Sequence, residues 1–295
     1  MRGPVVNLPD SELAPGLYLV ATPIGTARDI TLRALDLLAA ADVIAAEDTR
    51  SMRRLLEIHG IALGTRPLVS YHDHSGEKVR ARLLAALEAG QSVVYASEAG
   101  TPMVSDPGFD LVRAVRAAGG AVTSAPGPSA AITALTLAGL PTDRFFFAGF
   151  LPNGAGKRKS ALKQLMAVPG TLIFYESPHR IAAMLADAAA VLGGARQGAI
   201  CRELTKKFEE VLTGSLDELA ELTAGRKLKG EIVFLVGPGD SPKVKDIDLD
   251  SELTRALDNL SVRDAADQVA ARTGLKRRIV YQRALQLSKS GKANT

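Results

Sequence analysis

Three loops rich in glycine and proline are the stretches of this sequence best suited to chemistry. They are ATPIGTARD (21–29), SEAGTPMVSDPG (97–108) and SAPGPSAA (124–131). Glycine has no Cβ, so a ligand can approach main-chain N–H and C=O groups closely, and proline fixes φ and so holds the loop in shape. Exposed carbonyls, together with the carboxylates of Glu98 and Asp106, favour a ligand that carries positive charge and hydrogen-bond donors.

None of the three loops has the spacing of a nucleotide-binding motif. The G-x-G-x-x-G fingerprint and the P-loop pattern are both absent from the sequence, so we expect neither NAD nor ATP as cofactor. A sulfonium that also carries an α-amino group fits such loops better than a phosphate does. The alternative is that each loop is only a tight turn between a strand and a helix.

Each loop follows a short apolar run of the kind that forms a buried strand. These runs are LYLVA (17–21), QSVVYA (91–96) and AVTSA (121–125), and DVIAA (42–46) is a fourth. Segments with apolar residues at helical spacing alternate with them, which predicts a mainly parallel sheet with helices on both faces. Because ligands of such sheets bind outside the carboxyl ends of the strands, these loops are the expected binding site.

The second half of the chain predicts a mixed α/β domain. RFFFAGF (144–150), TLIFYE (171–176) and GEIVFLVGP (230–238) have the apolar character of strands, and we expect the three adjacent phenylalanines of the first to lie in a core. Residues 153–159 are rich in glycine and lysine and are expected to form a loop. Cys201 follows apolar residues and is expected in the core.

Pro141 interrupts a helical pattern and marks the expected boundary between the two α/β domains. We place the first domain at residues 15–140 and the second at residues 141–238. A linker rich in Pro, Gly and Asp follows at residues 239–250. Residues 251–295 then form a separate tail, for which we expect a small helical module.

The tail carries the excess positive charge of the chain. The net charge is +4, and the tail holds nine Lys and Arg against four Asp and Glu. Its apolar positions flank Gly274 with the spacing of a helix-turn-helix, whose second helix would present Lys276, Arg277, Arg278 and Arg283. We expect these side chains to contact nucleic-acid phosphates. The alternative is a helical hairpin that packs on the protein body or on another subunit.

A second basic group lies in the expected loop at the start of the second domain. Lys157, Arg158 and Lys159 are consecutive there, and they could follow an RNA backbone or simply be solvated. Only 4% of the residues are aromatic, so few rings are free to stack on bases. An RNA target would therefore be chosen mainly by its folded shape.

Cysteine and hydropathy patterns exclude several classes of protein. The single cysteine cannot form an internal disulfide, and no Cys/His cluster has zinc spacing, so we expect no metal. The first residues lack the apolar core of a signal peptide, and no apolar run has membrane-spanning length. We expect a cytoplasmic protein.

Six motifs, taken in order, carry a resemblance to a known family. They are TPIGTARDIT (22–31), EDTR (47–50), SEAGTPMVSDPG (97–108), APGPSA (125–130), YESPHR (175–180) and KGEIVFLVGP (229–238). Together they resemble the ribosomal RNA small subunit methyltransferase I family, the ribose 2′-O-methyltransferase branch of the tetrapyrrole methylases. The resemblance covers roughly residues 15–238, and its first loop, TPIG, is typical of this branch rather than of enzymes that act on porphyrins.

The resemblance implies a two-domain α/β fold that binds S-adenosylmethionine in the cleft between the domains. It also implies a homodimer that methylates one cytidine in the decoding region of 16S rRNA, within the small ribosomal subunit. Carried over to this sequence, the cofactor contacts would come from the three loops, at Pro23, Gly25, Glu98, Ala99, Gly100, Thr101, Pro126, Gly127, Pro128, Ser129 and Ala130.

Methyl transfer to a ribose hydroxyl needs alignment and a group that takes or compensates the proton. The candidates are Asp106, Glu176, His179, Glu203 and Lys206. Each has a structural alternative: Asp106 in a turn, His179 at a helix start, Glu176 in an i, i+4 pair with Arg180, and the remaining two as surface charges.

Two other functions are compatible with parts of the sequence. A tetrapyrrole methyltransferase would share the loops but would have no use for the basic tail. A non-catalytic RNA-binding assembly factor would have no need to keep Gly25, Gly100 and Gly127 in the loops. We favour the rRNA methyltransferase because it uses both features.

Overall fold

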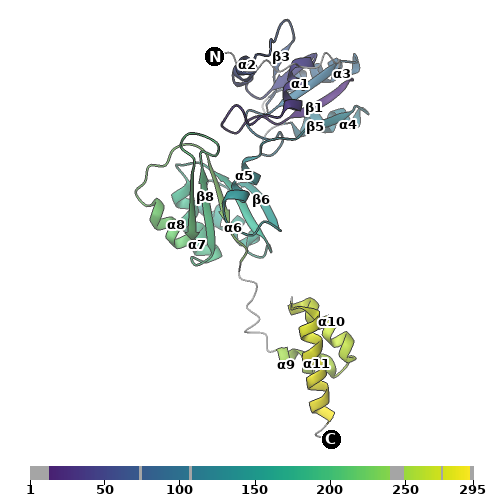
Figure 1. Cartoon of the computed structure of the whole chain (residues 1–295), viewed down its shortest axis with the longest axis vertical. Coiled ribbons are helices and arrows are strands. Elements are labelled where there is room, and N and C mark those ends of the chain that lie inside the picture. The colour runs from purple at the N-terminus through teal and green to yellow at the C-terminus, as the bar shows by residue number, and fades with distance from the viewer. Residues whose placement is uncertain (1–12, 73–74, 106–107, 240–248, 274, 293–295) are drawn as a thin grey trace. The chain divides into compact units, whose positions relative to one another are not determined.

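The computed structural model describes residues 13–72, 75–105, 108–239, 249–273 and 275–292. The chain divides into two compact units, Met1–Gly237 and Pro238–Thr295. The first unit contains two five-stranded sheets with their helices, and the second is helical (Figure 1).

The first sheet is entirely parallel, with strand order β3-β2-β4-β1-β5. Its strands are β1 (Gly16–Val20), β2 (Val43–Ala46), β3 (Leu68–Ser70), β4 (Ser92–Ala96) and β5 (Val122–Ala125). The connecting helices are α1 (Leu32–Ala40), α2 (Thr49–Ile58), α3 (Glu77–Glu88) and α4 (Phe109–Ala117). The predicted parallel sheet is confirmed, and it includes a short strand, β3, that was not predicted from the sequence.

Alternate residues along these strands face two separate cores. Val20, Ile44 and Val94 pack with α1 and α2 on one face of the sheet. Leu19 and Tyr95 pack with α3 and α4 on the other. Both faces are therefore buried, which explains why the strands read as continuous apolar runs.

The second sheet is mixed, with strand order β6-β7-β10-β8-β9 and only the β6–β7 pair parallel. Its strands are β6 (Phe145–Phe150), β7 (Thr171–Glu176), β8 (Gln197–Arg202), β9 (Glu210–Ser215) and β10 (Ile232–Val236). One face packs on α6 (Ala155–Leu165), α7 (Ile181–Leu192) and α8 (Leu216–Thr223).

The other face of the second sheet is covered by α5 (Ala130–Leu137). Ala134 and Leu135 of this helix pack with Ile173 and Leu235, and Ile24 from the first loop joins the same core. Cys201 is fully buried there, as expected. This shared core ties the first loop to the second sheet.

The expected loop at residues 153–159 is wrong, because α6 begins at Ala155. Arg158 is only 4% exposed and forms a buried ion pair with Asp187 of α7 at 2.6 Å. Its assignment to RNA binding is therefore wrong. The arginine joins α6 to α7, while Lys159 keeps a half-exposed side chain near the same carboxylate.

The expectation that the phenylalanines of β6 are core residues is also wrong for two of them. Phe145 is 46% exposed and Phe146 is 44% exposed, whereas Phe147 is partly buried against Tyr175. The physical reason is that β6 is the edge strand of its sheet. An apolar run does not reveal whether its strand is central or at an edge.

The C-terminal unit contains α9 (Leu249–Leu257), α10 (Val262–Thr273) and α11 (Arg277–Lys292). Its core includes Leu253, Val269 and Val280. Gly274, the expected turn between α10 and α11, lies outside the described residues.

Candidate active site

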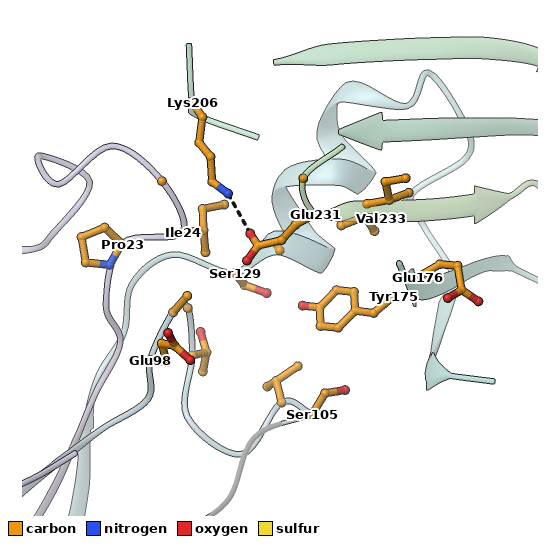
Figure 2. Close-up of a pocket in the computed structure, with 18 of the residues that line it drawn as sticks. Pro23, Ile24, Glu98, Ser105, Ser129, Tyr175, Glu176, Lys206, Glu231 and Val233 are labelled. Carbon is orange, nitrogen blue, oxygen red and sulfur yellow. Dashed lines mark hydrogen bonds and ion pairs between the residues drawn. The ribbon is translucent and has the colours of Figure 1, made fainter. Parts of the chain in front are cut away.

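A cavity of about 790 Å³ lies where loops of the first sheet meet the second sheet (Figure 2). From the first sheet it is lined by the loops that follow β1, β2 and β4 and by the residues that open α5. From the second sheet it is lined by the ends of β6 and β7, by Lys206 after β8, and by the start of β10. The carboxyl ends of the parallel strands therefore contribute to a pocket, as the sequence predicts.

Hydrogen bonds join the three predicted loops to one another. Thr22 and Gly100 exchange main-chain bonds of 2.9 and 3.0 Å, as two strands would. Ser97 donates its hydroxyl to the Gly100 carbonyl at 2.8 Å. Thr101 donates its hydroxyl to the Pro128 carbonyl at 2.9 Å. The loops therefore present one preorganised wall rather than three independent turns.

Most of the predicted cofactor residues line this cavity. The lining includes Pro23, Gly25, Glu98, Ala99, Gly100, Thr101, Ser129 and Ala130. Pro126, Gly127 and Pro128 are not among the lining residues. A Cβ on Gly127 would be 2.9 Å from the Ala21 side chain, so this glycine allows the β5 loop to pack closely on β1.

The charge of the lining is mainly negative. Glu47, Glu98, Glu176 and Glu231 contribute carboxylates, and Lys206 is the single basic residue among the described lining residues. Burial, and the neighbouring Glu47 carboxylate next, raise the pKa of Glu98. The pocket therefore holds negative charge that a cationic ligand would offset.

Of the four catalytic candidates that the structure describes, two line the cavity. Glu176 does, but its carboxylate is buried, accepts the Ser177 main-chain N–H at 2.7 Å and pairs with Arg180 at 3.3 Å. In Figure 2, Tyr175 lies between Glu176 and Lys206. Its carboxylate is therefore engaged in holding the start of α7, as the i, i+4 alternative anticipates.

The remaining candidates differ in their placement. Lys206 lines the cavity, whereas Glu203 is not among the lining residues and holds Lys206 through a 2.9 Å ion pair. His179 has an exposed side chain and is not among the lining residues. Asp106 lies outside the described residues.

Lys206 also donates to Glu231 at 3.0 Å, and Figure 2 shows this pair at the cavity. Burial acts to lower the pKa of Lys206, but the hydrogen bonds to Glu203 and Glu231 outweigh it and raise that pKa. The side chain is therefore an ammonium at neutral pH. It supplies positive charge rather than a base.

Sequence reasoning missed several residues of the pocket. Glu47, Tyr175 and Glu231 all line it, and the Tyr175 ring projects into the cavity in Figure 2. All three lie within motifs quoted for the family resemblance, EDTR, YESPHR and KGEIVFLVGP. Their place in those motifs was the available signal, but only the fold shows that they meet.

Two of the basic residues predicted on the tail are held in ion pairs within the C-terminal unit. Arg277 pairs with Asp267 of α10, and Arg283 pairs with Asp250 of α9. Lys276 and Arg278 are exposed at the start of α11. In the part of the chain that the structure describes, no helix is long and apolar enough to cross a membrane.

Comparison with known protein families identifies the family of this chain. The family model of the tetrapyrrole (corrin/porphyrin) methylases matches residues 16–220. The chain belongs to the tetrapyrrole methylase family. A second family model, the RsmI C-terminal HTH domain, matches residues 244–288.

Curated proteins similar to this chain refine the assignment. "Ribosomal RNA small subunit methyltransferase I" of Mesorhizobium japonicum is 48% identical over 95% of both chains. The protein of that name from Escherichia coli O157:H7 is 44% identical over 92% of this chain and 94% of its own. These relatives confirm the group predicted from the motifs, and the chain is a methyltransferase.

Solved structures of tetrapyrrole methylases share the fold. Uroporphyrin-III-C-methyltransferase from Thermus thermophilus has a TM-score of 0.53 at 25% identity, and it covers 76% of this chain and 94% of its own. The cobalt precorrin-4 methyltransferase CbiF has a TM-score of 0.54 at 14% identity and covers 75% and 94%. The predicted fold class is therefore confirmed.

Proposed function

We propose that this chain transfers a methyl group from S-adenosylmethionine to the ribose 2′-oxygen of a cytidine in the decoding region of 16S rRNA. The observation that carries the proposal is the cavity between the two sheets, with its preorganised loops and mainly negative lining. The names of the relatives supply the substrate class. We infer that the enzyme acts in the cytoplasm, where its ribosomal substrate is found.

The pocket residues fit the proposed cofactor. A sulfonium and an α-ammonium both carry positive charge, which the Glu98 and Glu47 side of the cavity would offset. Gly25 and Gly100 present backbone without a Cβ, so the ligand can reach main-chain groups. A solved family member, the Thermus thermophilus uroporphyrin-III C-methyltransferase, was complexed with S-adenosyl homocysteine.

When bound, S-adenosylmethionine supplies an activated methyl group, so the protein has mainly to align the ribose oxygen and manage its proton. We assign to the Glu231 carboxylate the role of accepting the proton of the ribose 2′-hydroxyl. This side chain is 77% exposed and lines the cavity. The Lys206 ammonium would stabilise negative charge on the ribose oxygen as the proton leaves. Tyr175 projects into the same space and would help to position the nucleoside.

The proposed RNA contacts lie at two places on the chain. Lys276 and Arg278 are exposed on the C-terminal unit, and Arg277 and Arg283 contribute positive charge although each is ion-paired. On α6, Lys157 is exposed and Lys159 is half-exposed. These side chains would bind phosphates, which provides affinity without reading base sequence.

We also propose a homodimer, formed through the exposed apolar face of α5 and β6. Ile132, Leu137, Phe145 and Phe150 are each between 43% and 58% exposed. β6 has one strand neighbour among the described strands, so its outer edge is open. A second copy of the chain would cover this edge and its apolar side chains. Sedimentation should show a dimer, and Phe145→Lys should shift it towards monomer.

The substrate class can be tested by offering several methyl acceptors together with labelled S-adenosylmethionine. The acceptors are 30S subunits that lack native methylation, naked 16S rRNA, and uroporphyrinogen III. We expect label in an RNA acceptor and none in the tetrapyrrole, and Lys206→Met should transfer label much more slowly. Label in uroporphyrinogen alone, or label in no acceptor despite cofactor binding, would contradict the proposal.

A further inference from the structure

The segment Glu203–Glu209, between β8 and β9, crosses from the second sheet to the first loop of the pocket. We call this segment the clasp. Thr205 accepts the Thr26 main-chain N–H on its hydroxyl at 3.1 Å, and its carbonyl accepts the Thr26 hydroxyl at 2.5 Å. Two hydrogen bonds, both donated by Thr26, thus join the clasp to the loop that contains Pro23 and Gly25.

The clasp has an unfavourable backbone. Glu203 has φ 52° and Thr205 has φ 61°, and a left-handed conformation is rare for a β-branched residue such as threonine. Surrounding contacts hold it in place: the Thr205 N–H donates to Glu209 at 2.6 Å, and the Glu203 carboxylate accepts the Glu231 N–H at 3.1 Å. A strained backbone conformation of this kind persists where several surrounding contacts hold it in place, and such positions are often found at functional sites.

Lys206 is the next residue after the strained threonine. Its ammonium bonds to Glu203 at 2.9 Å and to Glu231 at 3.0 Å. The direction of the lysine into the cavity is therefore set from two sides, by the carboxylates at its end and by the clasp backbone at its base. The base is held by the hydrogen bonds of Thr205 to Thr26 and Glu209. Main-chain hydrogen bonds of Lys206 with Glu203 and Glu209, and burial of the Leu204 side chain, also hold it, and the bonds between Thr205 and Thr26 join it to the first loop.

We propose that Thr205 is a positioning residue, which anchors the clasp on Thr26 and thereby places the Lys206 ammonium at the reacting ribose. Glu203 also helps to position Lys206, through its ion pair with the ammonium, and does not contact the substrate. This inference rests on the proposed function for its kinetic consequence. Its geometric content, the placement of Lys206, can be measured without any RNA.

Three substitutions at Thr205 separate the hydroxyl from the backbone strain. Thr205→Ser keeps the acceptor for the Thr26 N–H, Thr205→Val removes it at nearly constant shape, and Thr205→Gly removes it while also relieving the left-handed strain. Single-turnover methyl transfer to 30S subunits should fall roughly 10- to 100-fold in the valine and glycine variants, as expected for a misplaced catalytic group. The serine variant should stay close to the wild type.

A thermal melt distinguishes positioning from loss of fold. The glycine variant should unfold at or above the wild-type temperature because it loses strain, and yet it should be slow. Cofactor affinity should change less than the rate, since Lys206 acts on the acceptor. Wild-type rates in both the valine and the glycine variants would overturn the proposal, and so would rate losses that simply follow falls in melting temperature.

Acylation of Lys206 by acetic anhydride gives a readout that does not depend on activity. In the wild type, Lys206 should react more slowly than the exposed neighbour Lys207, because two carboxylates hold its ammonium and raise its pKa. The valine and glycine variants should raise the Lys206-to-Lys207 labelling ratio several-fold, and the serine variant should not. An unchanged Lys206-to-Lys207 labelling ratio in the valine and glycine variants would overturn the inference, whether or not the wild type methylates RNA. Failure of the wild type to methylate RNA, with the ratio changed as expected, would count against the proposed function alone.

Discussion

Replacing Gly25 with alanine tests the fit between the first loop and the clasp. An ideal Cβ on Gly25 would lie 2.5 Å from the Thr205 hydroxyl, 2.6 Å from Cγ of Lys206 and 2.8 Å from the Leu204 carbonyl oxygen. Side chains can rotate away, but the Leu204 carbonyl belongs to the backbone, so the clasp itself has to move. Overpacking of this kind costs about 1–3 kcal/mol.

That cost predicts a measurable loss of stability and a larger loss of activity. For a unit of this size, a melting temperature roughly 2–12 °C lower is expected. Displacing the clasp also withdraws Lys206, so methyl transfer should fall roughly 10- to 100-fold. Differential scanning fluorimetry and single-turnover transfer to 30S subunits measure the two effects in the same preparation.

Gly156→Ala is the matched control. Gly156 lies near the start of α6, and a Cβ there would meet nothing within 4 Å. Alanine should be neutral or slightly stabilising at that position. If Gly25→Ala melted and reacted like Gly156→Ala, the described packing of the clasp on the first loop would be incorrect.

Three further predictions concern charge. The pKa of Glu98 is raised in the folded protein, so its ionised form destabilises the fold as pH rises through that pKa. The Glu98→Gln variant should therefore have a higher melting temperature than the wild type at pH 7–8. This gain in melting temperature should vanish below about pH 4.5, where the carboxyl is protonated in the folded and the unfolded protein. A gain that persists at pH 4 would contradict this. Asp187→Ala leaves Arg158 buried without its carboxylate and should cost about 3–5 kcal/mol in urea unfolding; a loss below 1 kcal/mol would show that the pair is not buried. Replacing Lys276 and Arg278 by alanine should reduce the salt slope of RNA binding by about 0.7–0.9 per lost phosphate contact, and an unchanged slope would remove them from the interface.

Local patterns were sufficient to predict four of the five strands of the first sheet and the position of its loops, whereas the three-residue strand β3 was not predicted. Short apolar runs that alternate with segments of helical periodicity predict a parallel sheet, and the carboxyl ends of parallel strands meet at one edge of that sheet. Gly25 and Gly100 could therefore be placed at the edge of the sheet where the cavity lies from sequence alone. Gly127 could not be distinguished from them, because only the fold shows its close approach to the Ala21 side chain.

The errors arose where distant residues decide the outcome. Arg158 resembled a surface charge beside two lysines, but Asp187, 29 residues later, draws it into the protein interior. The phenylalanines of β6 have the apolarity of core residues, and only the sheet order shows that their strand is at an edge. The contacts of Glu203 likewise come from Lys206 in a turn and from Glu231, the residue before β10, and only the fold brings these two together.

The most direct test of the central claim is the identity of the methylated nucleoside. Unmethylated 30S subunits are incubated with the protein and labelled S-adenosylmethionine, and the 16S rRNA is then digested to nucleosides and mapped. The account predicts label in a single 2′-O-methylcytidine in the decoding region. Label on a base, on another nucleoside, or spread over many positions would contradict it.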